Sequence, residues 1–131
     1  MLRYLVAVLA MLPVSALPVS VWAHSDLNGP HGGDVEDANP GPYHLETAVQ
    51  GSTLSVFITD QDSNPVAAAD VTGTAVVLVN KVKEQVKLAP VSANQLQGSG
   101  SFVAAPDMRV LVSLVIEGQT QKALFTPPVK P

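Results

Sequence analysis

From residue 43 onward, hydrophobic and polar residues alternate along the chain, and this alternation predicts β-strands. The segment "YHLETAVQGSTLSVFITD" (43–60) places Leu45, Thr47 and Val49 on one face before "QGS", and Leu54, Val56 and Ile58 on one face after it. A period of two is typical of strands with one buried face, and a short polar break rich in Gly and Ser favours a tight turn. The segment is therefore expected to form a hairpin of two strands.

Further strands are expected over 72–80, 81–90, 94–104, 108–118 and 119–127, separated by turn-forming residues, and no helical period is present. Six or seven short strands favour an all-β fold, a small antiparallel immunoglobulin-like β-sandwich, with a closed barrel as the alternative. The residues expected in the core are Leu45, Leu54, Val56, Ile58, Val77, Val79, Val86, Leu88, Phe102, Val110, Val112, Leu114 and Phe125.

Residues 1–23 have the pattern of a secretory signal peptide, with a basic start, an apolar run and small residues before Ala23. We expect cleavage after Ala23 and export to the periplasm. A retained transmembrane anchor is the alternative, but two prolines interrupt the apolar run and no basic cluster follows it. No membrane association is expected after cleavage.

Residues 24–42, "HSDLNGPHGGDVEDANPGP", have a different composition from the rest of the chain. They contain four glycines, three prolines, four acidic residues and almost no large apolar side chain. Such a segment buries too little surface to offset its ordering entropy, so we expect a flexible arm before a β-sandwich over 43–127 and a short tail over 128–131.

Charge and cysteine content exclude several classes of function. Removal of 23 of the 131 residues leaves 108 residues with six Lys and Arg against eleven Asp and Glu, a net charge of −5. This balance argues against a nucleic-acid partner. The chain has no cysteine, which excludes disulfides, thiolate metal ligands and cysteine catalysis.

All three histidines, His24, His31 and His44, lie within 21 residues of one another. After cleavage His24 is the amino terminus, and it offers its α-amine and imidazole to one ion. His44 and Glu46 are two residues apart, so they share one face of the first strand. Imidazole and amine nitrogens suit Cu(II), with Ni(II) and Zn(II) next. The sequence therefore predicts a metal site made of His24, His31, His44 and Glu46.

The competing explanation for the three clustered histidines is ordinary composition, because polar segments are often rich in histidine. No His-x-His spacing is present to support a metal site. No catalytic residues are predicted, since the chain lacks a nucleophile elbow and a phosphate-binding glycine loop. The acidic segment "DQDSNP" (60–65) lacks the glycine and the distal glutamate of a calcium loop, so it is interpreted as a β-turn.

The segments "PHGGDV", "YHLE", "LSVFITDQDSNPV" and "GTAVVLVN" resemble a family of small exported bacterial proteins associated with heavy-metal resistance and efflux systems. The resemblance covers about residues 30–126 and is most specific at His31-Gly32-Gly33 and Tyr43-His44-Leu45-Glu46. It implies a periplasmic β-sandwich that handles divalent metal. A similar module is attached to adaptor subunits of resistance-nodulation-division efflux pumps, which implies an efflux adaptor or another envelope protein as partner.

Two functions follow from these observations. The first is a periplasmic accessory protein that binds copper, nickel or zinc reversibly. The second is a non-catalytic β-sandwich interaction module that docks onto an envelope or efflux component and binds no metal. The first predicts binding that weakens below about pH 6, where imidazoles become protonated.

Overall fold

The computed structural model describes residues 29–129, which form eight β-strands and no helix. The predictions for the signal peptide and for His24 concern residues outside this range. No helix in residues 29–129 has the length and apolar character needed to cross a membrane. The strands are β1 (Asp34–Asp37), β2 (His44–Gln50), β3 (Thr53–Thr59), β4 (Thr72–Val79), β5 (Val82–Ser92), β6 (Gln95–Ser99), β7 (Arg109–Ile116) and β8 (Gln119–Phe125).

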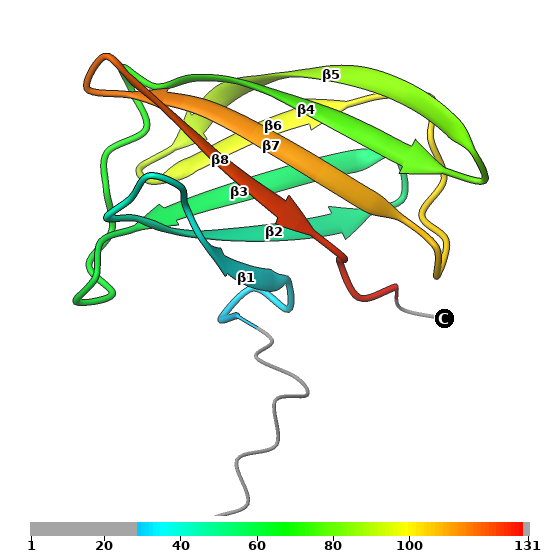
Figure 1. Ribbon diagram of the computed structural model, residues 1–131, viewed down its shortest axis with the longest axis horizontal. Coiled ribbons are helices and arrows are strands. Elements are labelled where there is room, and N and C mark those ends of the chain that lie inside the picture. Colours follow the sequence, from blue (N-terminus) through cyan, green and yellow to red (C-terminus); the bar gives the residue numbers. More distant parts are fainter. Residues whose placement is uncertain (1–28, 130–131) are drawn as a thin grey trace, which may run out of the picture.

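The strands pair antiparallel in the order β1-β2-β3-β6-β5-β4-β7-β8, and they form two layers that enclose the core (Figure 1). Strand β5 belongs to both layers. Its first part, Val82–Leu88, pairs with β4, and its last part, Ala89–Ser92, pairs with β6 across a bulge. A bulge bends a strand and increases its twist, which lets one strand turn from one layer into the other.

Contacts between the two ends of the strand order nearly close the sheet. Asn39 and Lys122 exchange two backbone hydrogen bonds of 2.9 Å, and the carboxylate of Asp34 accepts one of 2.8 Å from the Thr126 N–H. The fully buried amide of Gln121 also accepts a hydrogen bond from the Gly41 N–H and donates one to the Gly41 carbonyl. The segment before β2 is thereby fastened to β8.

Hairpin turns have the residues that their backbone requires. The turn between β4 and β5 places Asn80 and Lys81 at φ of 50° and 65°, and the turn between β7 and β8 places Glu117 and Gly118 at 50° and 78°. Two successive residues with positive φ define the turn whose twist matches that of paired strands. These turns fix the register of both hairpins.

The predicted all-β antiparallel sandwich is confirmed. Each of the seven expected strands is present as β2 to β8, and all thirteen expected core residues are buried. The expectation of a flexible arm up to residue 42 is wrong for Asp34–Asp37, which form an eighth strand paired with β2. This strand was missed because it buries little apolar surface and is held by backbone hydrogen bonds and side-chain anchors.

Candidate functional site

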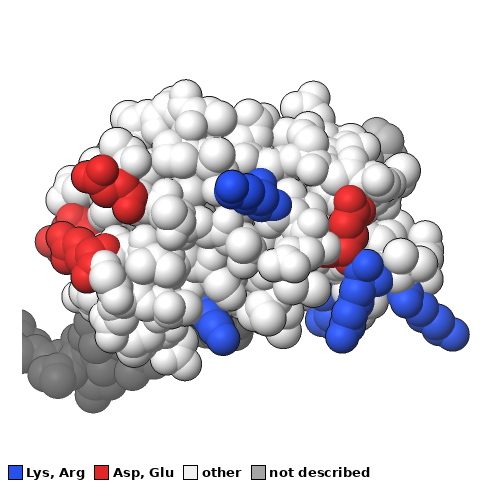
Figure 2. Space-filling model, turned by 90° about the horizontal axis from the view of Figure 1, so that it is seen from above, with Lys and Arg blue, Asp and Glu red and all other residues white. Residues whose placement is uncertain are grey.

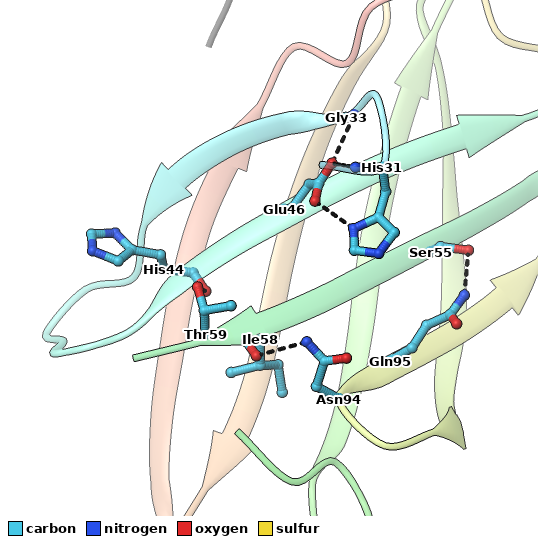
Figure 3. A network of polar contacts seen from close by, with 9 residues as sticks. All are labelled: His31, Gly33, His44, Glu46, Ser55, Ile58, Thr59, Asn94 and Gln95. Atoms are coloured by element: carbon cyan, nitrogen blue, oxygen red, sulfur yellow. Dashed lines mark hydrogen bonds and ion pairs between the residues drawn. The ribbon is translucent and has the colours of Figure 1, made fainter. Parts of the chain in front are cut away.

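The outer face of β2 carries two of the predicted site residues. Leu45 points into the core and is fully buried, so its neighbours His44 and Glu46 point to the opposite face, as predicted. His44 lies opposite Asp37 of β1, and Glu46 lies opposite Phe57 of β3. Figure 3 shows this face, together with Ile58, which takes part through its backbone carbonyl and has its side chain in the core.

A tight turn over residues 29–33 covers Glu46. The Gly29 N–H donates to the Gly33 carbonyl and the Gly32 N–H donates to the Gly29 carbonyl, both at 2.9 Å. Gly32 has a φ of 74°, in the left-handed region that glycine adopts without strain. The turn leaves Glu46 only 5% exposed although its side chain points away from the core.

Three hydrogen bonds hold the buried carboxylate of Glu46 (Figure 3). Its Oε2 accepts from the backbone N–H groups of His31 and Gly33, each at 2.9 Å. Its Oε1 lies 2.8 Å from Nδ1 of His31. A buried carboxylate needs such partners, since each unpaired polar group in a buried position costs free energy.

Close approach explains why glycines flank His31. A Cβ at Gly29 would lie 2.3 Å from the carboxyl carbon of Glu46, and a Cβ at Gly33 would lie 2.5 Å from the backbone carbonyl oxygen of Thr47. The first contact requires the Glu46 carboxylate to move from its hydrogen-bonded position, and the second requires the backbone of the turn to move. The His-Gly-Gly and Tyr-His-x-Glu segments are therefore two parts of one contact, in which a glycine turn wraps a carboxylate.

The imidazole of His31 is held in two directions. Its ring stacks on Phe57 with a centroid distance of 3.6 Å and an interplanar angle of 2°. Its Nδ1 faces the carboxylate of Glu46. From this hydrogen bond we assign the tautomer of the neutral ring that carries its proton on Nδ1. The other ring nitrogen, Nε2, then keeps a free lone pair.

His44 has the same arrangement with a different carboxylate. Its Nδ1 lies 2.6 Å from Oδ1 of Asp37, and the Asp37 side chain is 85% exposed. An exposed pair of this kind adds little to stability. It does fix the orientation of the ring, which again leaves Nε2 free.

His31 and His44 are both among the residues that line one cavity of about 530 Å³. Its wall also contains Glu36, Asp37 and the polar side chains of Thr59, Ser63 and Asn94. Within residues 29–129, no three His, Asp or Glu side chains lie close enough together to hold a metal ion. This part of the chain therefore brings two imidazoles to a shared cavity and does not complete a ligand set.

The acidic strand β1 forms one side of the cavity. Burial raises the pKa of Glu36 above its ordinary value, and the negative charges of Asp34 and Asp37 raise it further. A group of carboxylates that repel one another favours a cation nearby, because a cation relieves the repulsion.

Glu46 lies on the predicted face of β2, but the glycine turn covers it. Its oxygens already accept three hydrogen bonds beneath the glycine turn, so it orients His31 and has little capacity left for a metal ion. Asp37 and Phe57 were not predicted as site residues. Asp37 would have been found if residues 34–37 had been interpreted as a strand paired with 44–47.

Comparison with known proteins gives no match to any protein family, curated protein or solved structure.

Proposed function

We propose that the chain is an exported periplasmic accessory protein that binds a divalent metal ion, copper, nickel or zinc, in heavy-metal resistance or homeostasis. The proposed ligand atoms are Nε2 of His31 and Nε2 of His44. One observation carries the proposal: both described histidines have Nδ1 on a carboxylate and both line the same cavity.

The arrangement of each histidine matches what metal sites require. Imidazole ligands usually donate their second N–H to a carboxylate, which fixes the tautomer, orients the ring and increases the basicity of the ligand nitrogen. Glu46 plays this part for His31 and Asp37 plays it for His44. Imidazole nitrogen is a borderline ligand, which favours Cu(II), Ni(II) and Zn(II) over Mg²⁺ and Ca²⁺.

Two imidazoles leave a coordination shell incomplete, and His24 is the candidate that completes it. His24 lies seven residues before His31, and a chain of seven residues spans at most about 25 Å. Once the signal peptide is removed, His24 supplies an amine and an imidazole together. Water or a side chain of a partner protein is the other source of ligands, and such open binding suits a protein that passes metal on.

A titration of the exported protein tests this proposal. Intact mass establishes the amino terminus, and calorimetry then measures binding of Cu(II), Ni(II) and Zn(II). We expect stoichiometric binding with a Kd below about 1 µM, weakened at least about tenfold in His31→Ala and His44→Ala. The exposed Gln85→Ala, on the opposite layer, is the control and should bind as the wild type does.

Millimolar association that neither histidine substitution changes would sink the proposal. That result would leave the second predicted function, an interaction module that binds no metal. Binding retained in both single variants but lost when the amino terminus is blocked by acetylation would assign the metal to His24 alone.

A further inference from the structure

The outer face of β4, β5, β7 and β8 lies on the layer opposite the histidines. Alternation along these strands points Val77, Val86, Val112 and Ala123 into the core, and the residues between them point outward. We call this outer surface the basic face. Its outward residues are Thr72, Thr74, Val76, Leu78, Lys83, Gln85, Lys87, Arg109, Leu111, Ser113, Val115, Thr120, Lys122 and Leu124.

A row of apolar side chains crosses the middle of the basic face. Val76 pairs with Leu111, and Leu111 pairs with Leu124, so the row spans three neighbouring strands. Leu111 is 39% exposed and Leu124 is 56% exposed. Together with Val115 they make up three of the six large hydrophobic residues exposed in the described chain.

Basic side chains flank this row. Lys83 and Arg109 both pair with Leu78, Lys87 pairs with Thr74, and Lys122 pairs with Ser113. Four of the five Lys and Arg residues within 29–129 therefore lie on one face of a chain with a net negative charge.

The acidic residues in and around these strands do not lie on the basic face. None of the outward positions in the four described strands is Asp or Glu. Glu84 lies within β5 but on its other face, where it accepts a hydrogen bond of 2.7 Å from the Ser101 N–H, and Asp70, Asp107 and Glu117 lie in turns or loops. In the view of Figure 2, acidic groups likewise lie near both ends of the molecule, with Lys and Arg between and beside them.

Protection against aggregation accounts for only part of this distribution. Lysines protect sheet edges, where unpaired backbone groups invite another chain. Lys83 and Lys87 lie on the part of β5 (Val82–Leu88) that pairs with β4 alone, so they fit this role, but the apolar row of Val76, Leu111 and Leu124 does not. An apolar row beside the lysines also works against solubility, so the combination points to recognition.

A hollow at one end of the basic face could receive an apolar side chain of a partner protein. It has a volume of about 660 Å³ and is lined by outward residues that include Lys87, Ser113, Val115 and Thr120. Interfaces gain most of their free energy where a side chain fills such a pocket inside a polar rim.

We propose that the basic face is a docking surface for an acidic partner protein, bound through a segment that presents carboxylates around apolar side chains. Charge complementarity identifies the occupant: the face offers four cations and no anion, with an apolar centre. Four strands spaced about 4.8 Å apart give a face about 15 Å wide, so we expect a small, transient interface that is sensitive to salt. This inference does not depend on metal binding.

Fluorescence anisotropy with two labelled peptides tests the inference. One peptide repeats Glu-Glu-Leu and the other repeats Lys-Lys-Leu. We expect the mature protein to bind the Glu-Glu-Leu peptide with a Kd tighter than about 1 mM at low salt, and to lose at least about tenfold in affinity at about 0.5 M NaCl. The Lys-Lys-Leu peptide should not bind.

Matched variants locate the contact. The double variant Lys83→Glu/Lys122→Glu and the single variant Leu124→Ser should each weaken binding at least about fivefold. Lys81→Glu and Val103→Ser carry changes of the same kind at exposed positions outside the basic face and should bind as the wild type does. Thermal unfolding verifies that all four variants are folded.

Three results would overturn the inference. The first is no binding of the Glu-Glu-Leu peptide at low salt, and the second is an equal loss in the control variants. The third is a different occupant: binding to vesicles of phosphatidylglycerol but not to the peptide, or concentration-dependent self-association that Lys83→Glu/Lys122→Glu abolishes.

Discussion

The imidazole of His31 lies flat on the ring of Phe57, with 3.6 Å between the two centroids. The stack restrains the plane of the imidazole, and the contact with Glu46 restrains its rotation within that plane. Together they aim Nε2 in one direction, which is the condition for a preorganised ligand.

Replacing Phe57 with Leu removes the stack and keeps an apolar side chain. Stacked rings contribute about 0.5–1.5 kcal/mol beyond area burial, so we expect Phe57→Leu to fold and to bind metal about tenfold more weakly. In NMR spectra of the metal-free variant, the His31 ring protons should shift downfield as the ring current of Phe57 is lost. Unchanged His31 shifts would show that the stack is absent in solution.

Replacing Glu46 with Gln removes the charge of the buried group and keeps its size. One of the three donors around the carboxylate then faces an N–H instead of an oxygen. We expect the free energy of unfolding in urea to fall by about 1.5–3 kcal/mol. Glu117→Gln, in an exposed turn, is the control and should change it by less than about 0.5 kcal/mol.

Adding a methyl group at Gly33 pushes the turn away from β2, because the new Cβ meets the Thr47 carbonyl. We expect Gly33→Ala to cost about 1–3 kcal/mol of stability and to shift the amide resonance of His31. Gly51→Ala is the comparison: its Cβ meets nothing within 4 Å, so only the positive φ of 60° costs free energy. A Gly51→Ala variant that moved the His31 resonance equally would contradict this account.

Asp37→Asn tests the orienting role of a carboxylate without disturbing the core, because the side chain is largely exposed. The amide holds the Nδ1 proton of His44 less strongly than a carboxylate does. We expect about tenfold weaker metal binding in calorimetry with unfolding free energy changed by less than about 0.5 kcal/mol. Asp70→Asn makes the same change of charge at an exposed site outside the cavity and should leave affinity as it is.

The raised pKa of Glu36 makes stability depend on pH in a defined direction. Burial is the main cause of the raised value, and the charges of Asp34 and Asp37 add to it. A carboxyl with a raised pKa in the folded state favours folding while it is protonated. That contribution is lost as the pH rises from the ordinary value of 4.5 through the raised pKa.

Glu36→Gln should therefore be more stable than the wild type at neutral pH, and the advantage should shrink toward pH 4. Because the Glu36 side chain is mostly exposed, solvent screening limits the gain in unfolding free energy to roughly a few tenths of a kcal/mol. Urea unfolding of both proteins across this pH range measures it. An advantage that grows as the pH falls would contradict the assignment.

The sequence was sufficient to predict strands wherever a segment of alternating apolar and polar residues ended at turn-forming residues. The pair β2 and β3 shows this, because "QGS" separates two alternating segments, and the core residues follow from the same period. Strand β1 could not be predicted in this way. Its residues bury little apolar surface, and its place is set by pairing with β2 and by the contact between Asp34 and Thr126.

For the candidate site, sequence spacing placed His44 and Glu46 on one face correctly. It could not show that Glu46 is covered, because the covering turn comes from residues 29–33 and depends on glycines that fit against the backbone of β2. Spacing within one strand carries no information on which other segment folds over it. The role of Glu46 therefore became visible only in three dimensions.

The hydrogen bonds between Asn39 and Lys122 have a consequence for how other proteins can be recognised. A common way to bind an extended peptide is strand addition, in which the peptide pairs with an open sheet edge. Here the segment after β1 bridges to the middle of β8 and Asp34 binds the Thr126 N–H, so the two ends of the strand order cover part of each other's edges. A partner that binds at this seam is then recognised by side chains on the outer faces of the two layers, and its specificity depends on the chemistry of those faces.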